Sequence, residues 1–160
     1  MYQADQEMRH RVMAAGGVIE NEEDDQLDFK HTEQMKKIVE VIGWPTISRV
    51  GEEISEQAWL LVQHADHDVE FQKKCLELMK AADEGDVSKR NVAYLEDRIR
   101  VNEGRPQLYG TQFFGEGSMY GPRPIEEPEK VNERRREMGM ETLEEYKQAL
   151  IEKFKQYDRT

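Results

Sequence analysis

The chain has 160 residues, and its 23 Lys and Arg against 34 Asp and Glu give a formal net charge of −11. This length is enough for one hydrophobic core, and no stretch approaches the roughly 18 apolar residues that a membrane-spanning helix needs. The single cysteine excludes a disulfide framework and a multi-cysteine metal site. A pI near 4.9 argues against a binder of duplex nucleic acid, which would need a basic surface.

The N-terminal residues MYQADQ are polar and lack the basic segment and apolar stretch of a secretory signal. We therefore expect a soluble, cytoplasmic protein that does not bind membranes or nucleic acid. A mature secreted form is the alternative, because one unpaired cysteine is compatible with both compartments.

The first part of the chain predicts one helix and an acidic connection. A helix is expected over residues 5–15, ended by Gly16 and Gly17. Residues 20–26 (ENEEDDQ) form an acidic run, and such runs are usually solvated. Residues 1–27 are therefore expected to be a loosely packed helix followed by a mobile connection or a poorly packed helix start.

Two helices with strong apolar patterns are expected next. The first shows helical spacing of apolar residues up to Ile42 and stops at Gly43, before a rigid turn at residues 44–46 (WPT). The second is opened by Gly51, and its middle, residues 58–62 (AWLLV), is apolar on every side. A helix that is hydrophobic all round belongs at the centre of a fold.

The remaining elements are expected to be helical apart from one loop. A fourth helix carries Cys75 on its apolar face, where cysteine is a small buried side chain rather than a nucleophile. A fifth helix is capped by Ser88. Residues 104–121 combine frequent glycines with aromatic residues, which indicates an ordered loop or a short β-hairpin. Closing helices are expected over residues 131–138 and 143–157. The fold class is therefore a mostly α, single-domain helical bundle over residues 1–160.

The order of several short motifs resembles a bacterial family of domains of unknown function. The motifs D-Q-x-x-R, G-W-P, Q-H-A-D, D-R, Q-x-Y-G-T-Q and R-R read here Asp5-Gln6 with Arg9, Gly43-Trp44-Pro45, Gln63-His64-Ala65-Asp66, Asp97-Arg98, Gln107 to Gln112, and Arg134-Arg135. The resemblance implies a shared architecture and a shared site, and it supplies no reaction, substrate or cofactor. His31 and His67 depart from the family's pattern, so a mechanism that needs either would be particular to this chain.

His64 is the strongest catalytic candidate. It follows Leu60 and Leu61 by one helical turn, which places it on the buried side of the central helix near the C-terminal end. Histidine is suited to general acid–base work near neutral pH, and Asp66 or Asp97 could orient it. The alternative is a core histidine held by hydrogen bonds.

A metal site is the weaker interpretation of the same region. His64, His67 and Asp68 stand at i, i+3 and i+4, so they could face one side of a helix. Solvated side chains at a helix end explain the same pattern, and we predict no metal. The sequence does not indicate a cofactor or an oligomeric state.

Two further groups could bind a substrate. An inward Arg98, together with Arg9 or Arg134, would form an anion site, and an internal salt bridge is the alternative. Residues 107–112 (QLYGTQ) alternate as in a strand, so their amides and phenol could orient a polar substrate. Alternatively, these side chains hydrogen-bond the backbone of their own loop.

These features support a small enzyme, a hydrolase or group-transferase that acts on a polar or anionic small molecule or peptide. The expected catalytic residues are His64, Asp66 and Asp97, and the expected substrate-binding residues are Arg9, Gln63, Arg98, Gln107, Tyr109, Gln112 and Arg134. The hypothesis requires His64, Arg98 and Tyr109 to border one hollow. The alternative function is a non-catalytic binding or interaction module whose polar residues form a structural network.

Overall fold

The structure, a computed structural model, describes residues 1–14, 22–115 and 120–157. It is 67% helical, which confirms the predicted mostly α fold. Contacts divide the chain into two compact units, Met1–Asn91 (unit 1) and Val92–Thr160 (unit 2). No helix in the described ranges is both long and apolar enough to cross a membrane.

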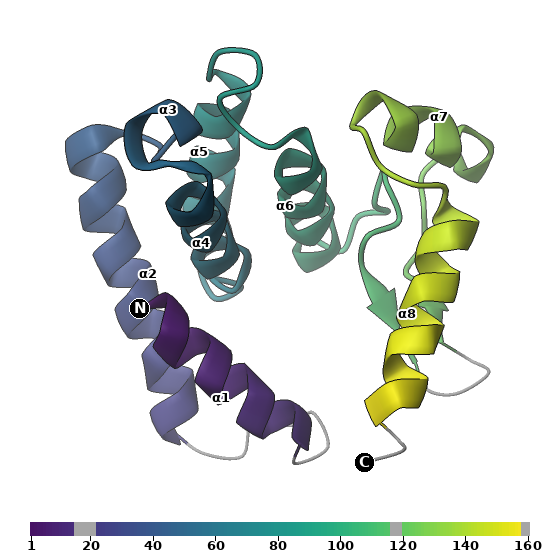
Figure 1. The fold of residues 1–160 in the computed structure, drawn as a ribbon, viewed down its shortest axis with the longest axis horizontal. Helices are drawn as coiled ribbons and strands as arrows, with labels where there is room; N and C mark the ends of the chain where they lie inside the picture. The colour runs from purple at the N-terminus through teal and green to yellow at the C-terminus, as the bar shows by residue number, and fades with distance from the viewer. Residues whose placement is uncertain (15–21, 116–119, 158–160) are drawn as a thin grey trace. The chain divides into compact units, whose positions relative to one another are not determined.

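Unit 1 is built around a central helix, as the apolar segment 58–62 predicts. Its helices are α1 (Tyr2–Ala14), α2 (Glu22–Ile42), α3 (Ile47–Val50), α4 (Glu52–Gln63) and α5 (Val69–Lys80) (Figure 1). Helix α4 contacts each of the other four. Among its residues, Ala58, Leu61 and Val62 are buried. Packing against four neighbours accounts for the lack of polar residues in segment 58–62 of this helix.

The N-terminal part of unit 1 is better packed than the sequence predicts. Asp5 and Met8 of α1 are fully buried, and α1 contacts both α2 and α4. Helix α2 begins at Glu22, so residues 22–26 of the acidic run form the first turns of this helix. Gly16, Gly17 and the first two residues of the run lie outside the described residues.

The two helices expected here, α4 and α5, are separated by residues 64–68, which the sequence left open as a continuation or an end of the central helix. Helix α4 ends at Gln63, with His64 in the C-cap position. Asp68 is the N-cap of α5, and its side chain accepts a hydrogen bond from the backbone N–H of Phe71 at 3.0 Å. An Asp that caps a new helix ends the preceding one without glycine or proline. Cys75 is fully buried in α5, and burial raises the pKa of its thiol to about 12, as expected for a core residue rather than a nucleophile.

Unit 2 contains most of α6 (Lys89–Asn102), whose first turn holds the boundary between the units. A short antiparallel hairpin follows, formed by β1 (Phe113–Phe114) and β2 (Gly121–Pro122), with Phe113 opposite Pro122. The predicted hairpin is therefore confirmed. The closing elements are η2 (Pro128–Lys130), α7 (Val131–Glu137) and α8 (Leu143–Tyr157), close to the predicted bounds.

The predicted strand over residues 107–112 is wrong. Only Gln107 makes a bridge, with Ile125, and Gly110 turns the chain with a φ of +67°. A Cβ at residue 110 would come within 2.8 Å of a Leu143 methyl carbon. Glycine is therefore required there both by the backbone angle and by the close approach of α8.

Candidate functional site

The main candidate site in unit 1 is a histidine–aspartate pair. Nδ1 of His64, at the end of α4, lies 2.8 Å from Oδ1 of Asp5 in α1. The Asp5 side chain is fully buried, whereas the His64 side chain is 19% exposed. The pair thus joins a buried carboxylate to a ring that still meets solvent, and Nε2 is on the side of the ring away from Nδ1.

Several contacts keep Asp5 ionised. Burial by itself raises the pKa of Asp5, but the hydrogen bond with His64, the electrostatic interactions with His64 and Arg9, and a 2.8 Å hydrogen bond from Gln6 together hold it below its ordinary value. An anionic carboxylate favours the imidazole tautomer that carries its proton on Nδ1. The unprotonated Nε2 of that tautomer is a proton acceptor.

Arg9 supports the same pair rather than standing open to an anion. Its Nη2 lies 2.6 and 2.7 Å from the two carboxylate oxygens of Asp28 in α2, and its Nε lies 3.5 Å from Asp5. Arg9 therefore links α1 to α2 as an internal salt bridge.

His31 is a second histidine buried near these charges. It is 4% exposed, and its Nδ1 has no hydrogen-bond partner in the described part of the chain. Burial lowers the pKa of His31, as does the N-terminal amine, while Asp5 and Asp28 oppose this. His31 is therefore a neutral core residue at neutral pH.

The other residues of the Q-H-A-D-H-D segment serve separate purposes. Asp66 accepts a 3.4 Å hydrogen bond from Gln72, and the buried Gln63 offers its backbone carbonyl to the same amide at 3.4 Å. The His67 ring stacks on Phe29, with centroids 3.9 Å apart. The carboxylate that contacts the imidazole is therefore that of Asp5, in place of the expected Asp66 or Asp97.

The metal interpretation also changes, because its premise was one helix through residues 64–68. Helix α4 ends before His64, and Asp68 forms a 2.7 Å ion pair with Lys36. Across the described ranges, no group of three or more His, Cys, Asp or Glu is arranged to hold a metal ion.

In unit 2, Asp97 is the acceptor around which the loop after α6 is folded. Its fully buried carboxylate accepts hydrogen bonds from the backbone N–H groups of Leu108 (2.7 Å), Tyr109 (3.1 Å) and Thr111 (2.9 Å), and from the Thr111 hydroxyl (3.0 Å). Burial raises the pKa of Asp97, and these hydrogen bonds oppose the rise. Asp97 thus fixes the loop instead of orienting a histidine.

The glutamine amides of the loop form hydrogen bonds within the loop and with Arg98 of α6. Gln107 is fully buried, accepts from the backbone N–H of Gln112 at 2.9 Å, and donates to the carbonyls of Gln112 and Arg123 at 2.9 and 2.8 Å. Gln112 in turn accepts a 3.0 Å hydrogen bond from Arg98. For Gln107 the structure matches the alternative in which a polar side chain bonds the backbone of its own loop, whereas the Gln112 side chain bonds Arg98 and the Thr111 hydroxyl.

Two of the three arginines of α7, Arg134 and Arg135, hold the same loop. Arg134 donates to the carbonyls of Leu108 and Glu126 at 3.0 and 2.6 Å. Arg135 is fully buried and donates to the carbonyls of Tyr109 and Glu141 at 2.7 and 2.6 Å. Arg134 and Arg135 thus both bind backbone carbonyls, and the predicted role of Arg134 toward an anion stays a prediction.

The predicted site residues fall into two groups. The structure brings His64 together with Arg9 in unit 1, and brings Arg98, Gln107, Tyr109, Gln112 and Arg134 together around Asp97 in unit 2. The meeting of His64, Arg98 and Tyr109 at one hollow stays a prediction.

Sequence reasoning missed Asp5 and Arg135 as key residues. A signal for Asp5 was present, because it precedes Met8 by three residues and therefore lies on the buried face of α1. Arg135 gave no such signal within a run of three arginines.

Taken together, these features define a mostly α protein with a histidine–aspartate pair in one unit and an Asp97-centred loop in the other. The chain belongs to DUF6624, a family of unknown function, whose family model matches residues 1–156. The predicted membership in a family of unknown function is thus confirmed. No curated protein and no solved structure shows significant similarity to the chain.

Proposed function

We propose that the protein is a small enzyme, a hydrolase or group-transferase, in which His64 is the general acid–base and Asp5 orients it. The observation that carries the proposal is the 2.8 Å contact between Nδ1 of His64 and a fully buried carboxylate, on a ring that is still 19% exposed. Partial exposure would let a substrate reach His64, whereas His31 is buried.

The chemistry follows from the orientation of the ring. Nε2 would take a proton from an attacking water or hydroxyl group while Asp5 stabilises the imidazolium that forms, and would then return the proton to the leaving group. Arg9 and Asp28 keep Asp5 in place through the ion pairs described above. A polar or anionic small molecule or peptide is the proposed substrate class.

The test compares variants on a panel of chromogenic esters, phosphate monoesters, phosphodiesters and peptide amides. His64→Gln keeps a donor for Asp5 but cannot exchange protons near neutral pH. We expect the wild type to turn over at least one class, and His64→Gln to lose about 10²–10⁴-fold in rate. His10→Gln, at an exposed position of α1, is the matched control and should keep the wild-type rate.

Two results would remove the enzyme proposal: no turnover of any class by the wild type, or equal turnover by His64→Gln. Circular dichroism melting of each variant checks that any loss of rate is not a loss of fold.

A second candidate function, a non-catalytic binding module, is favoured by the loop in unit 2. There the side chains of Asp97, Gln107 and Arg134 form hydrogen bonds with backbone groups, as expected of a structural network. Melting temperatures of His64→Ala, Arg98→Ala and Tyr109→Ala separate the two, because functional residues add little to stability. Large losses in all three would favour the binding module.

A further inference from the structure

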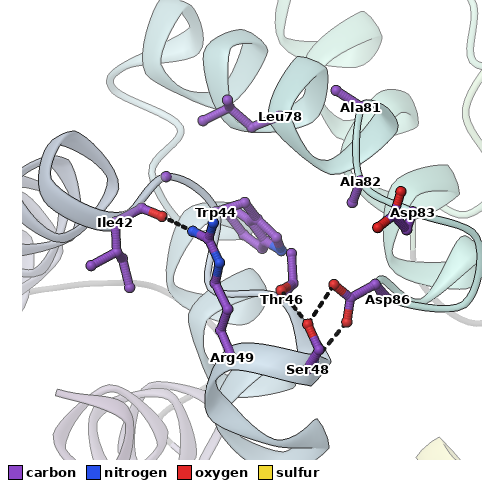
Figure 2. A pocket seen from close by; sticks show the side chains of 11 residues that line it. Ile42, Trp44, Thr46, Ser48, Arg49, Leu78, Ala81, Ala82, Asp83 and Asp86 are labelled. Carbon is purple, nitrogen blue, oxygen red and sulfur yellow. Dashed lines mark hydrogen bonds between the residues drawn. The ribbon is translucent and has the colours of Figure 1, made fainter.

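A pocket in unit 1 lies apart from the residues considered so far. It has a volume of about 540 Å³, within the usual range of roughly 300–1,000 Å³ for small-ligand sites. Its walls come from the end of α2, the G-W-P turn, α3, the end of α5 and the loop after α5 (Figure 2). The G-W-P motif, which the proposed function does not use, therefore forms part of a pocket.

The indole of Trp44 supplies an unsatisfied donor in this pocket. Trp44 is only 3% exposed, and its Nε1 has no hydrogen-bond partner within the described part of the chain. Figure 2 shows the nitrogen on the edge of the ring that faces Ala82 and Asp86. An indole N–H can only donate, and leaving a buried donor without an acceptor has a free-energy cost. A ligand that offers an acceptor oxygen there would recover this cost.

Two carboxylates give the same side of the pocket a negative charge. Asp86 is fixed by Ser48, whose backbone N–H and hydroxyl donate to it at 2.6 and 2.8 Å and hold its pKa below the ordinary value. Asp83 is exposed, and its carboxylate makes no hydrogen bond or ion pair with any described residue. This wall of the pocket therefore suits a cation.

The one basic side chain in the lining does not cancel this charge. Arg49 donates to the backbone carbonyl of Ile42, on the other side of the Trp44 ring from Asp83 and Asp86 (Figure 2). Two acids and one base leave the lining negative, and the net charge of −11 attracts cations to the whole chain.

Apolar groups complete the lining. Leu78, Ala81 and Ala82 contribute aliphatic side chains to the lining. An aliphatic stem could lie on these groups while its polar ends reach the acids and the indole N–H.

We propose that this pocket binds a lysine residue of a peptide segment, with its ammonium group at Asp83 and Asp86 and a backbone carbonyl accepting from Nε1 of Trp44. Lysine matches the three features together, because it joins a cation to a carbonyl acceptor through an aliphatic stem. The site is independent of the proposed catalytic role of His64.

The test is a titration of the ¹⁵N-labelled full chain with N-acetyl-lysine methylamide, followed by the indole N–H signals. Trp59→Phe assigns the signal of Trp44, because the chain has two tryptophans. We expect a saturable downfield shift of the Trp44 indole proton. Asp83→Asn should weaken binding about tenfold or more, as loss of a charged hydrogen bond does. Glu84→Gln, at an exposed neighbour outside the lining, should bind as the wild type does.

Two analogues test the parts of the ligand. N-acetyl-norleucine methylamide lacks the ammonium group and should bind at least about tenfold more weakly. Cadaverine, which lacks the carbonyl, should leave the Trp44 signal nearly in place. The proposal would be overturned by no saturable shift with the lysine probe, by equal binding of the norleucine analogue, by a full Trp44 shift with cadaverine, or by unchanged affinity in Asp83→Asn.

Discussion

Replacing Asp97 with alanine should release the loop of unit 2 and strongly destabilise it. The change removes the acceptor of three backbone N–H groups, those of Leu108, Tyr109 and Thr111. Each buried donor left without a partner costs about 1–3 kcal/mol, and partial exposure of the first two amides allows water to replace some of the loss. We therefore expect Asp97→Ala to lower the free energy of unfolding by about 3–5 kcal/mol, near the lower end of the summed cost of three unsatisfied donors. Asp97→Asn keeps one acceptor oxygen and should lose about half as much.

Two measurements check this prediction. Urea unfolding followed by far-ultraviolet circular dichroism gives the free energies, and hydrogen exchange gives the protection of the three amides. In Asp97→Ala these amides should exchange faster than the helical amides of α6, because the loop opens locally. Glu129→Ala, an exposed change in η2, is the control and should stay within about 0.5 kcal/mol of the wild type. The reasoning would be refuted by an Asp97→Ala protein within 1 kcal/mol of the wild type, or by unchanged exchange of the three amides.

Three further predictions follow from buried groups. Gly110→Ala should cost about 1–3 kcal/mol in urea unfolding, because residue 110 has a φ of +67° and faces Leu143; an unchanged midpoint would contradict the close approach. Arg135→Met should cost about 3–5 kcal/mol, since it leaves two backbone carbonyls without their donor, and a midpoint equal to that of the exposed Arg136→Met would count against this role. The lowered pKa of His31 means that the unfolded chain binds a proton more readily than the fold, so stability is complete above the ordinary value of 6.5 and falls as the pH drops below it. His31→Gln should remove the loss of stability between about pH 7 and 5, measured by unfolding followed by tryptophan fluorescence of unit 1. The contribution of Asp5 to stability is lost only at still lower pH. Identical stability profiles of His31→Gln and the wild type would contradict the role given to His31.

The helices of this chain were predictable because apolar residues recur at helical spacing. The apolar segment 58–62 predicted the central position of α4, and frequent glycines between aromatic residues predicted the hairpin. These signals are local in the sequence, so they can be recognised without knowing which elements pack against one another. The end of α4 was harder, since no glycine or proline marks it. The available signal was Asp68, three residues before Phe71, as an N-cap.

The polar sites depended on contacts between distant parts of the chain. Asp5 and His64 are separated by 59 residues, and no periodicity reveals which carboxylate meets the ring. The alternation of residues 107–112 suggested a strand, but the buried Asp97 carboxylate draws three of their amides toward itself and bends the segment. A single buried acceptor thus outweighed a local pattern.

The most direct test of the central claim is the protonation state of the two His64 ring nitrogens, measured by ¹⁵N NMR of the neutral imidazole. The account predicts that the neutral ring carries its proton on Nδ1, hydrogen-bonded to Asp5, and that Nε2 is unprotonated. In Asp5→Asn the population of this tautomer should fall. A neutral ring with its proton on Nε2 in the wild type, or a tautomer unaffected by Asp5→Asn, would contradict it.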